Sequence, residues 1–246
     1  TGGELAFFVS FLIIIAVFGP VMIQKLWRCR PVEEGKKRSD IEAICKKAGV
    51  GFADILYWPI FGSRMITAGV MGLVKRFRYI LVTKSLLSLL EPEEVEAVIA
   101  HEAGHIKRNH LVFYLLFFLG YMLLAVSTFD LVIYSVIYAK PFYRFLIDSG
   151  IRQPPLISIS YGIAITAIFL VYFRFIFGFF MRNFERQADT HVFSFFENAR
   201  HLISTFEKIA ALSGRSPAKP DWHHFSIEER IGFLKKCDAD RSLVKR

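Results

Sequence analysis

The sequence predicts a mainly α-helical integral membrane protein with three membrane-spanning helices and a charged domain that contains a small β-sheet. Of its 246 residues, 54% are hydrophobic and the mean hydropathy is +0.40. This is more apolar surface than a soluble core of that size can bury, and it also excludes a disordered chain. The apolar residues fall in three long runs, whereas 27 of the 31 Lys and Arg residues lie in the two segments that flank the second and third runs.

The first apolar run, Leu5 to Gln24, contains twenty residues without a charge. A helix of this length is about 30 Å long, which matches the hydrocarbon thickness of a bilayer. The basic residues that begin a signal peptide are absent before it, and the run is too long for the apolar part of one. We therefore expect a transmembrane helix over residues 1–24.

The second run extends from Leu111 to Ala139 and is interrupted only by Asp130, and the third extends from Leu156 to Met181 and is interrupted only by Arg174. The intervening loop, residues 140–155, is rich in proline and glycine and cannot continue a helix. Residues 111–181 are therefore predicted to form a transmembrane hairpin.

The charge distribution predicts the orientation. Segments 25–110 and 182–246 flank the hairpin, so they must lie on the same side of the membrane, and the excess of basic residues places that side in the cytoplasm. The net charge of +9 is thus explained by a lipid bilayer as partner, without nucleic acid. No glycine-rich phosphate-binding motif occurs, so no nucleotide is expected.

A helix is predicted to start at Glu91, because Pro92 suits its first position and acidic residues fill its first turn. This helix carries His101-Glu102-Ala103-Gly104-His105. The i, i+4 spacing puts both imidazoles on one face, where they can bind one metal ion, with Glu102 beside them. Such an H-E-x-x-H pattern arises by chance in roughly one such chain in a hundred, and the alternative is a helix with two surface histidines.

The third metal ligand distinguishes classes of zinc protease. The metzincin pattern fails, because Leu111 stands where a histidine is required and His110 is one residue out of register. An intramembrane site also fails, because charged residues surround the motif. A carboxylate from a separate helix remains, and segment 182–189, which contains Glu185 and Asp189, begins where the third span returns to the same membrane face.

These motifs together resemble the integral-membrane zinc endopeptidases typified by HtpX and the type-I CaaX prenyl protease. The resemblance covers residues 54–235 and three ordered motifs: H-E-x-x-H at 101–105, E-x-x-A-D at 185–189, and His-x5-Arg at 224–230. The segment Tyr79–Leu87 before the acidic helix start is also similar. The resemblance implies a cytoplasmic gluzincin-type protease domain, with its first half in 25–110 and its second half in 182–246.

Residue by residue, the resemblance implies that one zinc ion per chain is bound by His101, His105 and Glu185. Glu102 would be the general base, and His224 would stabilise the oxyanion. Two supporting residues are implied: Asp189, which would hydrogen-bond a ligand histidine, and Arg230. Phe225 replaces the proline that the family has after this histidine, so whether His223 or His224 faces the zinc is open.

Two functions are open at this point. The first is a zinc metalloendopeptidase in the membrane, expected to be the prokaryotic cytoplasmic membrane, that hydrolyses membrane-associated or unfolded polypeptides on the cytoplasmic side. Its substrate would pair as an extended strand along Arg64–Gly69. The second is a non-catalytic membrane regulator or scaffold with a protease-like fold. The presence of Glu102 favours the enzyme, because a binding-only zinc site needs no base.

Overall fold

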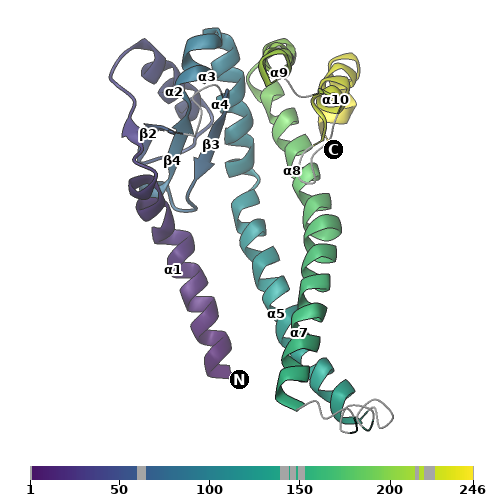
Figure 1. The fold of residues 1–246 in the computed structure, drawn as a ribbon. Coiled ribbons are helices and arrows are strands. Elements are labelled where there is room, and N and C mark those ends of the chain that lie inside the picture. Colours follow the sequence, from purple (N-terminus) through teal and green to yellow (C-terminus); the bar gives the residue numbers. More distant parts are fainter. Residues whose placement is uncertain are drawn as a thin grey trace. The chain divides into compact units, whose positions relative to one another are not determined.

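The computed structural model describes residues 2–59, 65–138, 144, 148, 153–213, 216–218 and 225–245. The chain forms two compact units, one made of Thr1–Phe113 with Met181–Arg246 and the other of Tyr114–Phe180 (Figure 1). The longer helices are α1 (Gly2–Leu26), α2 (Lys36–Lys47), α3 (Lys84–Leu89), α4 (Pro92–Lys107), α5 (His110–Tyr138), α7 (Gln153–Val171), α8 (Gly178–His191), α9 (Arg200–Ser213) and α10 (Ile227–Ala239). Four strands are β1 (Arg30–Pro31), β2 (Asp54–Tyr57), β3 (Ala68–Met71) and β4 (Tyr79–Val82).

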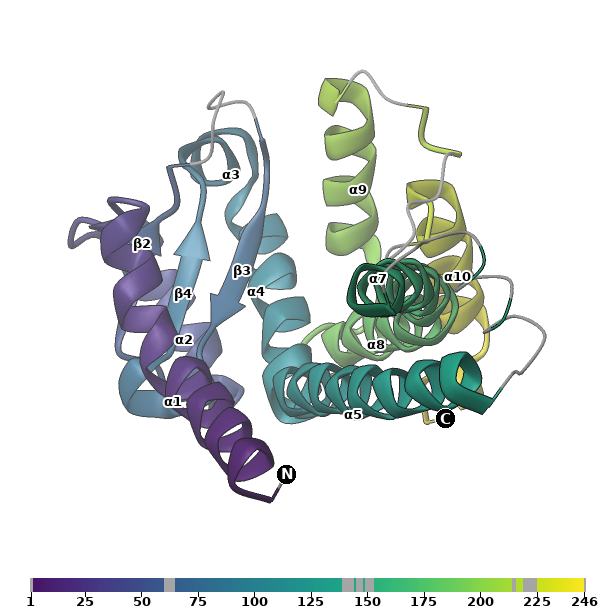
Figure 2. The same ribbon diagram turned by 60° about the horizontal axis from the view of Figure 1, so that its bottom comes forward.

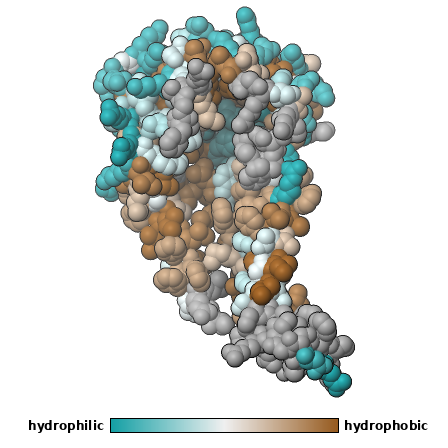
Figure 3. All heavy atoms as spheres, in the orientation of Figure 1, coloured by the Kyte–Doolittle hydropathy of each residue, from teal (hydrophilic) through white to brown (hydrophobic). Residues whose placement is uncertain are grey.

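Three helical stretches of the described chain are long and apolar enough to cross a membrane: Ala6–Leu26, His110–Tyr134 and Ser158–Ser194. Their side chains are largely exposed, as lipid-facing side chains are, and Figure 3 colours them mostly brown. This confirms the prediction of three spans. Of the predicted loop at 140–155, the structure describes residues 144, 148 and 153–155, and all five are helical. The helix of the third span therefore begins at Gln153, because the two prolines at 154 and 155 are accommodated in the first turn of α7.

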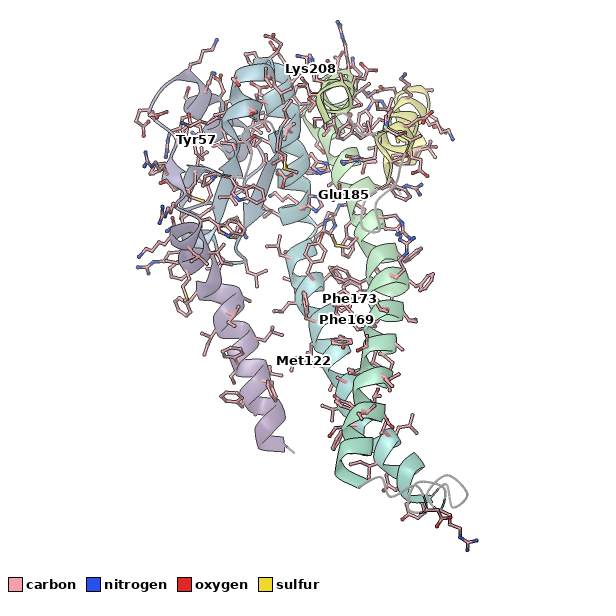
Figure 4. The ribbon with its side chains drawn as sticks, in the orientation of Figure 1. Tyr57, Met122, Phe169, Phe173, Glu185 and Lys208 are labelled. Atoms are coloured by element: carbon pink, nitrogen blue, oxygen red, sulfur yellow. The ribbon has the colours of Figure 1, made fainter. Side chains whose placement is uncertain are left out.

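Aromatic rings pack against one another in the unit Tyr114–Phe180. Phe169 and Phe173, both labelled in Figure 4, have ring centroids 4.5 Å apart, and Tyr121 lies edge-on to both. The hydroxyl of Tyr172 donates to the carbonyl of Phe117 at 2.8 Å. A π-helical segment, η2 (Tyr172–Phe177), separates α7 from α8 and was not predicted from the apolar pattern of this run.

The sheet has the order β1-β2-β4-β3, in which β2 and β4 run parallel and both outer pairs are antiparallel (Figure 2). Its side chains form one core with α2, α3 and α4. The members of this core that are at most 1% exposed include Ile41, Cys45, Ile55, Ile80, Val82, Leu86 and Ile99. The zinc-signature helix is therefore fixed against a sheet by burial of aliphatic side chains.

The edge strand β3 begins four residues later than the expected substrate strand at Arg64–Gly69. Arg64 lies outside the described residues, and Thr67 is not part of a strand. Its backbone N–H donates to the Thr83 hydroxyl at 3.3 Å, and its carbonyl accepts from Thr83. The described part of the expected segment overlaps β3 at Ala68 and Gly69, and Thr67 continues the contact with Thr83, the residue that caps α3.

Helix α4 is held at its N-terminus by a buried carboxylate. Glu94 is 4% exposed, and it accepts hydrogen bonds from the backbone N–H of Glu91 (2.8 Å), the hydroxyl of Ser204 (2.7 Å) and the ammonium of Lys208 (2.6 Å). Burial raises the pKa of Glu94, but these donors outweigh burial and hold that pKa below its usual value. Ser204 and Lys208 both lie on α9, and Lys208 is labelled in Figure 4. The carboxylate of Glu94 therefore connects α4 to α9.

Candidate metal centre

The two histidines of the H-E-x-x-H motif face each other on α4. Their Nε2 atoms are 3.3 Å apart, and His101 is only 8% exposed. Neighbouring residues of α4, among them Ala97, Ile99, Ala100 and Ala103, are buried against the core and α9. The helix is thus oriented by its apolar side chains so that both imidazoles point to one place.

Helix α8 supplies a carboxylate at the same place. Glu185 lies with Oε2 at 3.7 Å from Nε2 of His101 and Oε1 at 3.5 Å from Nε2 of His105, and Figure 4 shows it on α8 facing α4. The ligand atoms of these three residues all lie within 4.8 Å of one another. The structure therefore brings together the three residues expected to bind metal.

The close approach of α4 and α8 depends on Gly104. A Cβ atom at this position would lie 2.8 Å from Cβ of His191 and 3.0 Å from Cα of Ala188, which is closer than such atoms pack. Glycine at the middle of the motif thus permits the contact between helices that carries Glu185 to the histidines.

The spacing of the three donors fits a zinc ion. Nitrogen and oxygen ligands that each lie about 2.1 Å from a tetrahedral zinc are about 3.4 Å from one another. The two imidazole nitrogens are 3.3 Å apart, and each lies 3.7 or 3.5 Å from a different oxygen of Glu185, which is close to this value. Two imidazoles and one carboxylate are also the donor set of a class of catalytic zinc sites that keep a fourth position open.

A buried charged network supports His101. Its Nδ1 lies 3.0 Å from Oδ1 of Asp189, which is 0% exposed. Asp189 accepts two hydrogen bonds from Arg230 on α10, from Nε at 3.0 Å and from a terminal nitrogen at 2.6 Å. The same terminal nitrogen lies 3.3 Å from Glu185. Asp189 thus lies behind His101, and Arg230 lies between Asp189 and Glu185.

These contacts shift the pKa values of the groups that surround the motif. Burial lowers the pKa of His101, but the hydrogen bond and charge of Asp189 raise it above its usual value. Burial and the neighbouring His101 lower the pKa of His105 to about 3, so this imidazole is neutral at physiological pH. Burial lowers the pKa of Arg230, but the charges of Asp189 and Glu185 outweigh burial and raise this pKa above its usual value. The guanidinium therefore stays ionised.

His110 is a site residue that the sequence did not indicate. It is fully buried, its Nδ1 lies 2.9 Å from Nδ1 of His105, and its Nε2 lies 3.1 Å from Oε1 of Gln187. On a continuous helix, five residues would turn it about 140° away from His105. The helix is broken between α4 and α5 by Asn109, whose φ of 55° is a left-handed conformation that asparagine tolerates, and the break brings the two rings together.

Of the remaining predicted site residues, the structure describes Glu102 but not His224. Glu102 lies beside the two histidines on α4 and contributes to the negative potential at Arg230. His223 and His224 both lie outside the described residues. The next residue, Phe225, is described, and its ring lies under the guanidinium of Arg186 at 4.2 Å. Phe225 thus contacts α8 at the residue that follows Glu185.

The family of the chain follows from its similarity to known proteins. Residues 31–238 match the model of "Peptidase family M48". The chain belongs to this peptidase family. Members of family M48 are in general zinc-dependent metalloproteases, which agrees with the donor set at His101, His105 and Glu185.

Among relatives of this M48 chain, "Protease HtpX homolog" of Aeropyrum pernix is 26% identical over 232 residues, covering 88% of this chain and 67% of its own length. "CAAX prenyl protease 1" of Saccharomyces cerevisiae is 25% identical over 248 residues, covering 91% of this chain and 54% of its own. The crystal structure of S. mikatae Ste24p shares the fold with a TM-score of 0.72 at 20% identity, covering 94% of this chain and 57% of that one. The chain thus spans between about half and two thirds of these relatives.

Proposed function

We propose that this protein is a zinc-dependent membrane endopeptidase that hydrolyses peptide bonds of membrane-associated or unfolded polypeptides at the cytoplasmic face. The observation that carries the proposal is the convergence of His101, His105 and Glu185, which each offer one ligand atom within 4.8 Å of the other two. His101, His105 and Glu185 would hold one zinc ion per chain. Membership of family M48 supports the same reaction.

When bound in such a site, zinc supplies a Lewis acid that lowers the pKa of water and polarises a carbonyl. The carboxylate of Glu102 takes a proton from the attacking water as the oxygen bonds to the peptide carbon. Glu102 then gives that proton to the amide nitrogen as the C–N bond breaks, so the products are a carboxylic acid and an amine, which exchange the remaining proton to become a carboxylate and an ammonium. His224 is assigned to donate to the oxyanion.

The substrate is proposed to bind as an extended strand along β3. This strand is at the edge of the sheet, so one row of its backbone N–H and carbonyl groups is not paired with β4. Edge pairing binds any extended sequence through its backbone, which suits a protease that acts on unfolded segments.

The cytoplasmic location is supported by the basic residues on both sides of the hairpin. Single cysteines can be placed at Ser216 and at Asp148 in a variant without Cys29, Cys45 and Cys237. A membrane-impermeant thiol reagent applied outside intact cells should label the cysteine at 148 and not the one at 216. The opposite labelling pattern would reverse the proposed orientation.

The reaction is tested with the purified full chain in detergent or nanodiscs. We expect one zinc per chain and cleavage of casein, loss of both after treatment with a chelator, and recovery on addition of zinc. A protein that binds zinc but cleaves no polypeptide would favour a regulator or scaffold instead. A protein that binds no zinc would overturn the assignment of the site.

A further inference from the structure

His110 connects a metal-binding histidine to a neutral amide. It is 0% exposed, and each ring nitrogen lies within hydrogen-bond distance of one side chain: Nδ1 at 2.9 Å from His105 and Nε2 at 3.1 Å from Gln187. Its ring is stacked on Phe184, with centroids 4.2 Å apart and planes 13° apart. The plane of this imidazole is therefore fixed by packing and its edges by two polar contacts.

The proton positions follow from the chemistry of these groups. Oε1 of Gln187 can only accept, so the proton between it and His110 is on Nε2 of His110. A neutral imidazole has one N–H, and Nδ1 of His110 is thus an acceptor. Nδ1 of His105 supplies the proton of the 2.9 Å contact, which leaves Nε2 of His105 with a lone pair directed towards Glu185.

The opposite arrangement is incompatible with metal binding. If the amide nitrogen of Gln187 donated to His110, then Nδ1 of His110 would carry the proton and would donate to His105. Nε2 of His105 would then carry a hydrogen at the place where the three donors converge. The identity of the atom that Gln187 presents therefore decides whether His105 can be a ligand.

We propose that His110 and Gln187 are positioning residues that fix the tautomer and the orientation of His105, so that its Nε2 is kept as a donor to the metal ion. This inference rests on the proposed zinc function. The side chains that carry it come from three places: His105 from α4, His110 from the start of α5, and Gln187 from α8, between Glu185 and Asp189. The helix α8 thus supplies a ligand and supports both ligand histidines.

The test compares variants of the full chain that keep shape but change polarity. His110→Phe keeps a ring against Phe184 and removes the acceptor. His110→Asn restores it, because its Oδ1 occupies the place of Nδ1. Gln187→Leu removes the outer acceptor, whereas Gln187→Glu keeps it. His191→Phe is the matched control, because the Nε2 of His191 is buried without a hydrogen-bond partner among the described residues.

Two quantities are measured for each variant: zinc affinity by chelator competition, and the visible absorption of bound Co²⁺, which reports the coordination geometry. We expect His110→Phe to weaken zinc binding about 10- to 100-fold and to change the Co²⁺ spectrum. His110→Asn and Gln187→Glu should stay within a few-fold of the unmodified protein, Gln187→Leu should lie between, and His191→Phe should leave both readouts unchanged.

The outcomes separate this inference from the proposed function. If the unmodified protein binds zinc and His110→Phe binds it equally with an unchanged spectrum, the positioning role is wrong and the protease proposal stands. If His110→Asn is as damaging as His110→Phe, or His191→Phe is equally damaging, packing and not the acceptor matters, and the inference is overturned. Absence of zinc in the unmodified protein would overturn the proposed function and, with it, this inference.

Discussion

The two histidines proposed as zinc ligands lie one turn apart on the same helix, but they are held in different ways. His101 is held by a charged network, in which its Nδ1 lies 3.0 Å from Asp189 and Asp189 accepts two hydrogen bonds from Arg230. His105 is held by a neutral one, which runs through His110 to Gln187. Both networks orient a ring by its Nδ1 and leave Nε2 towards Glu185.

The difference follows from the charge that a buried site can carry. With both histidines neutral, the carboxylates of Glu102, Glu185 and Asp189 and the guanidinium of Arg230 leave two net negative charges near the site. A second carboxylate behind His105 would add another negative charge in a region with little water, and buried charge is costly unless it is paired. A histidine and a glutamine supply the same orientation without that cost. Loss of either network should therefore weaken metal binding, but only loss of the charged one should strongly destabilise the fold.

The largest effect on zinc binding is expected when the carboxylate of Glu185 is removed while both networks remain. Glu185→Ala leaves two nitrogen donors, so zinc stoichiometry should fall from one per chain to none and proteolysis should cease. Glu207→Ala, which removes an exposed carboxylate from α9, is the control and should keep full occupancy. Elemental analysis after gel filtration measures both. Full occupancy in Glu185→Ala would show that another residue is the third ligand.

The charged network is tested with Asp189→Asn. An amide can still accept from His101, but Arg230 loses its principal counter-charge while it remains buried. We expect the free energy of unfolding to fall by about 3–5 kcal/mol, in addition to weaker zinc binding. His110→Asn, the corresponding change in the neutral network, should cost much less stability. Equal losses of stability in chemical denaturation would remove the distinction between the two networks.

Gly104→Ala tests whether zinc binding depends on the close approach of α4 and α8. The added methyl group would meet Ala188 and His191, so α8 must shift away from α4. We expect a loss of about 1–3 kcal/mol of stability and weaker zinc binding. The control is Gly232→Ala on α10, where a Cβ meets nothing within 4 Å, and this change should raise stability by about 0.5–1 kcal/mol. A thermal shift assay that ranks the two variants in the reverse order would contradict the packing argument.

The smallest effect is expected at Glu94, which anchors α4 away from the metal. Its folded-state pKa is depressed, so its ionised form stabilises the fold above the unfolded pKa, and this contribution is lost as pH falls through the folded pKa. Glu94→Gln should cost about 1 kcal/mol at neutral pH, because Lys208 is partly exposed to solvent. Zinc affinity should be unchanged. A destabilisation that persists undiminished in acid would show that charge is not its cause.

Local patterns in the sequence predicted much of the fold and of the site. The three spans are visible as apolar runs, the start of α4 as Pro92 followed by acidic residues, and the ligand pair as the i, i+4 histidines. Glu185 and Asp189 stand four residues apart on one helix, so one face of α8 carries both. Each of these features depends on the period of a single helix or on its length.

The features that the sequence did not predict depend on breaks between elements. His110 reaches His105 only because the helix ends at Lys107 and restarts at His110 through the positive φ of Asn109. Two signals in the sequence could have indicated the neutral network: Asn109, which tolerates a positive φ, and His110, which follows His105 by five residues.

The central claim is that this site performs hydrolysis and does not merely bind metal. Glu102→Gln tests it most directly, because the amide keeps the shape of the side chain while removing the base. We expect zinc content and substrate affinity close to those of the unmodified protein, while casein turnover falls by at least about 10²–10⁴-fold. Turnover at the unmodified rate in this variant would contradict the proposed mechanism and favour a non-catalytic role for the zinc site.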